Sequence, residues 1–282
     1  MRPFRYSPLI ALAMVLGITG CTGQPSHEEY ADYTATLIAL GDLRTETAPI
    51  DAPYSNDDLV RNFSRIALRH EHDISQAGSE LNADANPLQR WSDEIRYKLI
   101  GNGFDSTDRF EVHKLMRRIA NLTGLSVVEA EEDLNFLIFV TLPEERQATT
   151  QILYGVHPSL GLSFDTWRKS SDIVCMATNL FSQTNPNEIV FGMVSIGSEV
   201  DGILRRSCLH EEIVQALGLG NDDPTVRPSI FNDDEEFALL TEHDEYLLRV
   251  LYDPRLKPGM GETEATPVVR QIVSELRPEG GI

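Results

Sequence analysis

The sequence predicts an α+β domain with one mixed, mostly parallel sheet, and three observations support this prediction. Short β-rich runs alternate with longer segments whose apolar residues recur at helical spacing. One run, residues 136–140, is apolar at every position, which is typical of a strand buried on both faces of a sheet. Residues 53–260, where we expect this domain, suffice for one sizeable core and contain no internal repeats or low-complexity blocks. Residues 261–282 are expected to form a C-terminal tail.

The first half of the domain is expected to begin with a helix. Ser55-Asn56-Asp57-Asp58 has the cap and the early acidic residues of a helix that continues to about His70. The two histidines of His70-Glu71-His72 would point to different sides of this helix, which favours a solvated face over a metal site. The order then continues with a strand over 91–100, a capped amphipathic helix over 106–124, and strands over 125–130 and 135–142.

The second half of the domain is expected to end on the most informative helix of the chain. Residues 151–170 show no clear pattern, and we expect insertions or short helices there. Strands over 172–178 and 188–196 flank the turn Asn185-Pro186-Asn187. A helix from about 202 to 217 follows.

The N-terminus has the three regions of an export signal. Arg2 and Arg5 precede an apolar run over 8–18 that is too short to span a bilayer. We therefore expect residues 1–20 to be a signal peptide. Residues 22–52 are polar and contain prolines, so we expect a flexible tether between the anchor and the domain.

The end of this signal resembles the bacterial lipobox. In Ile18-Thr19-Gly20-Cys21 the cysteine would become the first mature residue, diacylated and then N-acylated. The resemblance implies a stable lipid anchor on Cys21, because several acyl chains on one residue hold a protein where one chain would not. Thr22 in place of Asp implies the outer membrane, facing the periplasm, in a Gram-negative host. The alternative is an ordinary cleaved signal with an incidental cysteine.

The charge of the chain excludes nucleic acid as a partner. Removing residues 1–20 takes away two of the 24 basic residues and none of the 44 acidic ones, so the formal net charge changes from −20 to −22. Such a surface repels phosphate backbones and anionic headgroups. Cations and basic surfaces remain as partners.

Two cysteines remain once Cys21 is lipidated. In an oxidising compartment Cys175 and Cys208 are most simply read as one disulfide, which would stabilise the fold by roughly 3 kcal/mol. The competing interpretation is a catalytic thiol at Cys208 beside His210. It is weaker, because the sequence marks no other histidine or asparagine partner.

Residues 210–222 resemble the zinc helix of a metzincin protease from which the zinc ligands have been replaced. The pattern H-E-x-x-H-x-x-G-x-x-H places two histidines one turn apart, a general-base glutamate between them, and a glycine that lets a third ligand turn in. In this frame the chain has Glu211, Glu212, Gln215, Gly218 and Asn221, and the turn at Gly218 would bring Asn221 or Asp222 back to the helix. His210, just before the frame, is expected to be a surface or second-shell residue and could serve as a pH-sensitive group.

Two later segments extend this resemblance. Pro228-Ser229-Ile230-Phe231-Asn232 stands where a metzincin has its Met-turn, with Phe231 in place of Met. Residues 239–252 are similar to the final helix of matrixins. The predicted order of strands and helices before residue 210 is also the metzincin order, so the resemblance implies a zincin-like domain.

A second resemblance covers about residues 40–260. The chain resembles a family of proteobacterial lipoproteins, domain-of-unknown-function family 2927, which implies no established activity. The residues that carry it are Leu43-Arg44, Asp51-Ala52-Pro53-Tyr54, Asp58-Leu59-Val60, Arg90-Trp91, Leu122-Thr123-Gly124-Leu125, Glu211-Glu212-Ile213-Val214-Gln215, Leu217-Gly218-Leu219, Asn221-Asp222, Pro228-Ser229-Ile230-Phe231 and Leu251-Tyr252-Asp253-Pro254-Arg255.

The residues in the helix frame do not suit zinc. One carboxylate and two amides would hold Zn²⁺ poorly, since it prefers imidazole and thiolate. Oxygen ligands suit Ca²⁺, Mg²⁺ or Mn²⁺ better, but the acidic run 232–236 is more simply a solvated loop. We therefore assign no metal and no cofactor. Glu211 and Gln215 are expected to bond to the backbone of the Met-turn-like segment and replace the metal as a clamp.

Two classes of function remain. The first is a membrane-anchored lipoprotein whose zincin-like domain no longer cuts and instead holds a protein or peptide in the old cleft or on an edge strand. The second is a metal-dependent hydrolase with atypical oxygen ligands. There Glu212 would be the general base, if burial and Glu211 raise its pKa.

Overall fold

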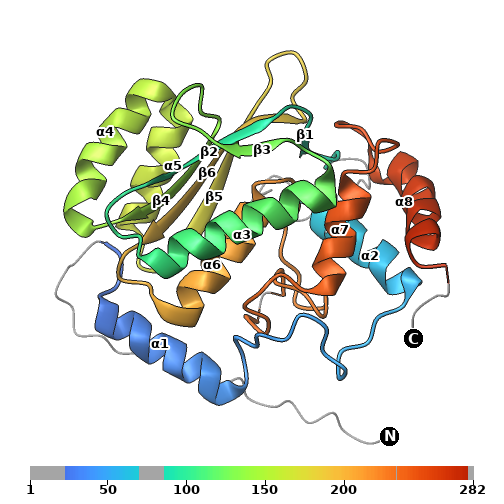
Figure 1. Cartoon of the computed structure of the whole chain (residues 1–282), viewed down its shortest axis with the longest axis horizontal. Coiled ribbons are helices and arrows are strands. Elements are labelled where there is room, and N and C mark those ends of the chain that lie inside the picture. Colours follow the sequence, from blue (N-terminus) through green and yellow to red (C-terminus); the bar gives the residue numbers. More distant parts are fainter. Residues whose placement is uncertain (1–22, 70–85, 233, 279–282) are drawn as a thin grey trace, which may run out of the picture.

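The sheet at the centre of the molecule is mixed and mostly parallel, as predicted (Figure 1). A computed structural model describes residues 23–69, 86–232 and 234–278. The expected signal peptide, Cys21 and the segment His70-Glu71-His72 lie outside the described residues. Within the described part, no helix combines the length and the apolar character needed to cross a membrane.

Strand order places one antiparallel strand at an edge. Strands β1, β6, β4, β2 and β3 pair in that order and are parallel, while β5 pairs antiparallel with β6. The predicted strand over 91–100 is two pieces, because the chain passes from pairing with β6 to pairing with β4 and β3. The strands are β1 (Arg90–Trp91), β2 (Ile95–Ile100), β3 (Val127–Glu129), β4 (Phe136–Thr141), β5 (Cys175–Phe181) and β6 (Glu188–Gly197).

Most helices begin at a residue whose side chain caps the first turn. Ser55, Asp105 and Thr241 each accept a hydrogen bond from the third residue of the helix they precede. The described helices are α1 (His27–Leu40), α2 (Asn56–Ala67), α3 (Ser106–Thr123), α4 (Arg146–Val156), α5 (Pro158–Lys169), α6 (Gly202–Gln215), α7 (Glu242–Leu251) and α8 (Glu262–Leu276), with a 3₁₀ turn at Pro143–Glu145.

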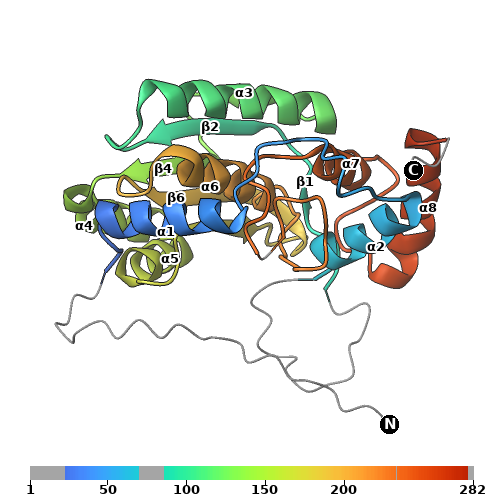
Figure 2. The same cartoon turned by 90° about the horizontal axis from the view of Figure 1, so that it is seen from below.

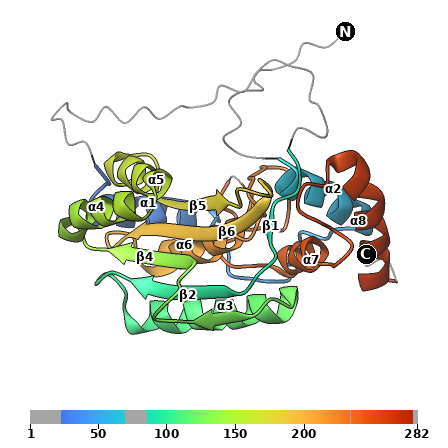
Figure 3. The same cartoon turned by 90° about the horizontal axis from the view of Figure 1, so that it is seen from above.

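The two faces of the sheet bury two separate apolar clusters. Strand β4 is buried at every position, which confirms the prediction from its sequence. On one face Phe136, Ile138 and Val140 pack with α3 and α6, and on the other Leu137 and Phe139 pack with α4 and α5. Figures 2 and 3 show α3 and α5 on opposite sides of the sheet.

The segment 151–170, where insertions or short helices were expected, belongs to a hairpin of two helices, α4 and α5. Its inner side chains Leu160, Phe164 and Trp167 are fully buried against the sheet. Their spacing of four and three residues is helical. Pro158 at the first position of α5 explains the sharp turn from α4.

The prediction of a flexible tether over 22–52 is wrong for the residues that form α1. Ser26 and Glu29 form a capping box, and Tyr30 and Leu37, seven residues apart, are buried on one side of the helix. After α1 the chain runs beside the segment 235–238, where Leu43 donates its backbone N–H to the carbonyl oxygen of Glu235. The cap at Ser26 and the burial of Tyr30 and Leu37 stabilise α1, although the sequence of this segment is mostly polar.

The prediction of a C-terminal tail from residue 261 is wrong as well, because residues 262–276 form α8. Val269, Ile272 and Val273 are buried, and α8 packs along α2. Asn56 of α2 donates a side-chain hydrogen bond to the carbonyl oxygen of Arg277, at a distance of 3.0 Å. The domain therefore extends beyond residue 260.

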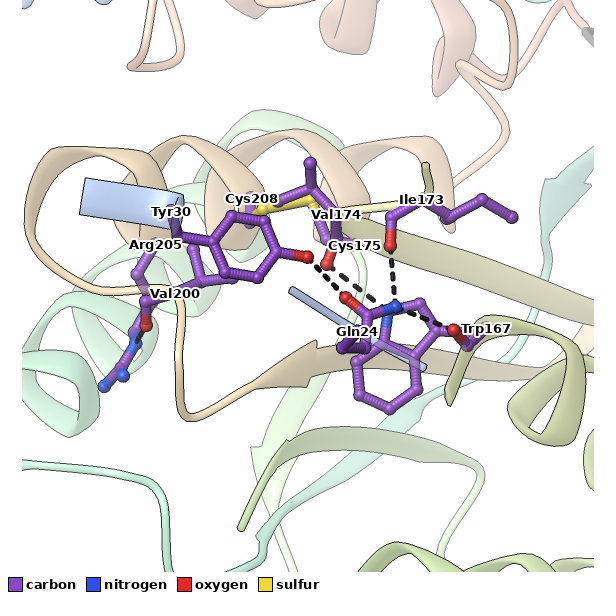
Figure 4. Close-up of a disulfide and its surroundings, with 9 residues drawn as sticks. All are labelled: Gln24, Tyr30, Trp167, Ile173, Val174, Cys175, Val200, Arg205 and Cys208. Atoms are coloured by element: carbon purple, nitrogen blue, oxygen red, sulfur yellow. Dashed lines mark hydrogen bonds between the residues drawn. A yellow bond between two sulfur atoms is a disulfide. The ribbon is translucent and has the colours of Figure 1, made fainter. Parts of the chain in front are cut away.

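The predicted disulfide between Cys175 and Cys208 is confirmed, with a Cα–Cα distance of 5.9 Å. Figure 4 shows that it joins the start of β5 to α6. Cys208 is buried, so the competing interpretation of a catalytic thiol is excluded in this structure. The bond fixes α6 beside the edge strand three residues before Glu211.

Candidate functional site

The predicted site residues lie at the C-terminal end of α6, and a glycine turns the chain there. Helix α6 ends at Gln215, and Gly218 has a φ of 109°. A Cβ atom at this position would lie 2.1 Å from the carbonyl oxygen of Gln89, which no side chain permits. The requirement for glycine is thus both conformational and steric.

The turn at Gly218 brings Asp222 back to α6. Gln215 donates its Nε2 to both carboxylate oxygens of Asp222, at 3.1 Å each. Asn221, expected beside Glu211 and Gln215, instead donates to the carbonyl oxygen of Arg65 and joins the turn to α2. The expectation that Gln215 bonds to the backbone of the Met-turn-like segment is wrong, because both of its hydrogen bonds go to Asp222.

A cavity of about 460 Å³ lies between α1, β5 and α6. Three of the predicted residues, Glu211, Glu212 and Gln215, are in its lining, and Glu212 is only 6% exposed. Its remaining lining residues are Tyr33, Asp172, Ile173, Val174, Cys175, Met176, Ala177, Asn179, Gly220, Asp222 and Glu235. We call this space the α6 cavity.

Five carboxylates line the α6 cavity: those of Asp172, Glu211, Glu212, Asp222 and Glu235. Among the residues that the structure describes, no lysine, arginine or histidine is part of this lining. The wall formed by residues 173–177 is apolar and includes Cys175 of the disulfide, with Asp172 and Asn179 at its two ends. The cavity therefore combines a negative side with an apolar side.

The negative charge of the cavity affects the pKa of Tyr33 in α1. Its side chain lines the cavity and remains 39% exposed. Burial raises the pKa of Tyr33, and the negative charges of Glu235, Asp42 and Glu211 raise that pKa further. The sequence prediction missed Tyr33, because it treated the region around α1 as a tether.

Strand β5 forms one long side of the cavity. In the described part of the chain β5 pairs only with β6, so its outer edge has no strand beside it. The lining residues from Asp172 to Asn179 belong to this edge and to the segment before it. An unpaired edge can hydrogen-bond to an extended peptide.

A buried aspartate of α7 holds the Met-turn-like segment. Asp244 is fully buried and accepts hydrogen bonds from the backbone N–H of Ile230, at 3.1 Å, and from the hydroxyl of Ser229, at 2.5 Å. It also accepts from the backbone and the hydroxyl of Thr241. Asp244 thus has the clamping role that was expected of Glu211 and Gln215.

Phe231, the residue in place of Met, is fully buried in the apolar core. Its backbone N–H donates to the hydroxyl of Ser229, and its carbonyl oxygen accepts from the N–H of Asp223. The second bond joins this turn to the residue after Asp222. The turn therefore supports the cavity through the backbone, without a side chain in its lining.

His210 belongs to the core and does not line the cavity. It is 6% exposed, and its Nδ1 accepts a hydrogen bond from the backbone N–H of Leu240 at 3.0 Å. Burial lowers the pKa of His210 to about 3, and the positive charges of Arg118, Arg206 and Lys114 lower it further. The expectation of a surface residue is wrong, because the imidazole is buried in the core.

The lining of the α6 cavity does not suit zinc. It contains carboxylates, amides and a phenol, whereas protein zinc sites are built mainly on imidazole and thiolate. The one sulfur pair in the wall is oxidised to a disulfide. Within the described ranges no three His, Cys, Asp or Glu residues are grouped to hold a metal ion.

Comparison with known proteins identifies the family of the chain. Residues 56–271 match the model of a family described as Protein of unknown function (DUF2927). Comparisons with curated proteins and with solved structures give no match. The matched region includes β5, α6 and the Gly218 turn, whereas α1 and Tyr33 precede it. The chain therefore belongs to the DUF2927 family.

Proposed function

We propose that this protein is a lipid-anchored extracytoplasmic binding protein with a degenerate metzincin-like domain. In this proposal the α6 cavity holds a cationic group of a peptide or of another envelope component. The observation that supports it is the lining of the cavity, which combines five carboxylates with the apolar residues 173–177 and contains no basic side chain among the described residues.

The order of the elements supports the metzincin-like part of the proposal. The chain runs β2, α3, β3, β4, the α4–α5 hairpin, β5, β6 and then α6, turns at Gly218, passes the segment at 229–231, and ends this region with α7. Apart from the inserted α4–α5 hairpin, this is the order that the metzincin resemblance implies. The oxygen donors around α6 support the loss of zinc-dependent proteolysis.

The shape and chemistry of the cavity favour a lysine or arginine side chain. Long basic side chains place their methylene groups on apolar surface and keep the charged group among polar partners. Ile173, Met176 and Ala177 supply the apolar surface, and Glu211 and Asp222 are among the carboxylates. A peptide strand added to the edge of β5 would bring its side chains to this place.

The lipid anchor and the envelope location are proposed from the N-terminal sequence. The lipobox-like residues before Thr22 support acylation of Cys21. The disulfide supports an oxidising compartment, because structural disulfides persist there and are rare in the cytosol. The anchor attaches the protein to the outer membrane, facing the periplasm.

A metal-dependent hydrolase is the second candidate. Glu212 favours it, because this carboxylate is almost fully buried and lines the cavity, as a general base must. Oxygen-preferring cations would then replace zinc. Measurements of peptide binding and of metal-dependent cleavage separate the two candidates.

The test measures binding of an extended heptapeptide with one central lysine to the detergent-solubilised mature protein. Its matched control peptide has norleucine at the central position. We expect the lysine peptide to bind at least fivefold more tightly, which corresponds to ~1 kcal/mol for a half-buried ion pair. Glu211→Gln should reduce this ratio, whereas Glu132→Gln, which changes an exposed carboxylate far from the cavity, should not.

Two results would contradict the proposal. Equal binding of the two peptides would remove the preference for a cation. Stoichiometric metal in the purified protein, together with peptide cleavage that a chelator abolishes, would establish the hydrolase instead. Loss of that cleavage in Glu212→Gln would identify the general base.

A further inference from the structure

The outer side of the α4–α5 hairpin exposes apolar side chains. Ile152 is 67% exposed, Val156 59% and Leu162 60%, and Tyr154, whose ring lies over Gly161 of α5, is 40% exposed. The inner side of the same hairpin is buried against the sheet, so the position of these helices is fixed. We call the exposed side the hairpin surface. Ile152 and Val156 are one turn apart on α4 and share a side of that helix, and Leu162 is exposed on α5. Large apolar side chains exposed in this way indicate an interaction surface.

The α4–α5 hairpin also differs from the rest of the chain in charge, because it is not acidic. Residues 147–164 contain no Asp, Glu, Lys or Arg. The whole hairpin, residues 146–169, contains three basic residues and one acidic residue, in a chain whose formal net charge is −20. The hairpin is thus a part of the molecule that anionic headgroups would not repel.

The described chain begins on the same hairpin. Gln24 donates its Nε2 to the carbonyl oxygens of Trp167, at 2.7 Å, and Ile173, at 2.9 Å, at the end of α5 (Figure 4). The hydroxyl of Tyr30 in turn bonds to the Oε1 of Gln24. Gly23 lies against the carbonyl oxygen of Arg168.

The distance from this point to the anchor is short. Cys21 precedes Gly23 by two residues, which span at most ~7 Å of chain. A lipid on Cys21 would therefore enter the bilayer close to the end of α5. Because Gln24 is bonded to the domain, no long linker separates the domain from the membrane.

We propose that the hairpin surface docks onto the phospholipid bilayer beside the lipid of Cys21. This inference rests on the anchor in the proposed function, and it adds an orientation. Ile152, Val156 and Leu162 insert at the level of the headgroups. The lipid and the hairpin together hold the protein in one orientation, as a lipid plus a second contact does in other anchored proteins.

The test uses tryptophan as a depth probe in the full mature lipoprotein. Val156→Trp places the probe on the hairpin surface, and Phe110→Trp is the matched control. Phe110 is 60% exposed on α3, on the opposite side of the sheet. The native Trp91 and Trp167 are fully buried and give a constant background.

Both variants are reconstituted into vesicles of phosphatidylglycerol and brominated phosphatidylcholine. We expect the bromine atoms to quench at least half of the added fluorescence of Val156→Trp and none of that of Phe110→Trp. Equal quenching of both probes, or no quenching at position 156, would overturn the docking. A dimer in detergent that Val156→Asp dissociates would assign the surface to a second copy of the chain and would overturn it too.

A separate measurement tests the anchor. Mass spectrometry of the N-terminal peptide shows whether Cys21 has acyl chains. The acyl chains can be present, and the protein can float with the vesicles, while the probe at position 156 is not quenched. In that case the docking is wrong and the anchor stands. If the chains are absent, the anchor is wrong and the docking falls with it.

Discussion

Replacing Asp244 by Ala should strongly destabilise the domain, because this carboxylate joins α7 to the turn that supports the α6 cavity. Asp244 is fully buried and accepts from two backbone N–H groups, those of Ile230 and Thr241, and from two hydroxyls. The hydroxyls can rotate to other acceptors, and for Thr241 the carbonyl oxygen of Pro228 is within reach at 2.9 Å. The two N–H groups cannot.

The size of the effect follows from those two groups. Each buried donor left without an acceptor costs ~1–3 kcal/mol, and there are two of them. We therefore expect Asp244→Ala to lower the free energy of unfolding by about 2–6 kcal/mol. Asp244→Asn, which keeps the shape and one acceptor oxygen, should lose less.

Urea denaturation of the mature protein measures this change. The fluorescence of Trp91 and Trp167, both fully buried, reports on unfolding, and the variants must share one m-value for the comparison to hold. Glu132→Ala, at an exposed loop position, is the control and should stay within about 0.5 kcal/mol of the parent. A loss below about 1 kcal/mol in Asp244→Ala would refute the clamping role.

Two further predictions concern a buried residue within α6 and the turn that follows this helix. Gly218→Ala should cost about 2–4 kcal/mol by the same urea assay, since φ is positive and the new Cβ meets the carbonyl oxygen of Gln89; an unchanged midpoint would contradict it. For His210, the folded pKa of about 3 lies below the unfolded value of 6.5, so the unfolded chain binds the extra proton and stability falls as the pH drops from about 6.5 toward 3. His210→Asn keeps an acceptor for the N–H of Leu240 and should make the free energy of unfolding less dependent on pH between about 6.5 and 3. An equally strong pH dependence in the variant would exclude His210 as its source.

The sequence predicted best where one local pattern has one structural solution. The continuous apolar run of β4 can only be buried on both faces, and it is. Apart from Cys21 the chain has two cysteines, and the single pairing they allow, Cys175 with Cys208, is the one observed. The end of α6 was located correctly because Gly218 is required where the helix frame predicts a turn.

The sequence failed where tertiary contacts overrule composition. Helix α1 has only two buried residues, Tyr30 and Leu37, and its order depends on a surface supplied by the rest of the domain. Tyr33 was missed with it. After the turn Asp222, and not Asn221, faces Gln215. The spacing of the residues does not determine which of these two neighbours points to the helix.

The disulfide has a consequence for how a ligand would be selected. Cys175 lies in the β5 wall of the cavity and Cys208 on the helix that provides Glu211 and Glu212, so a covalent bond joins the two walls. The disulfide therefore fixes the distance between these two walls of the α6 cavity before a ligand binds. A receptor with rigid walls loses little entropy on binding and discriminates by fit, because it has no closing motion with which to adapt.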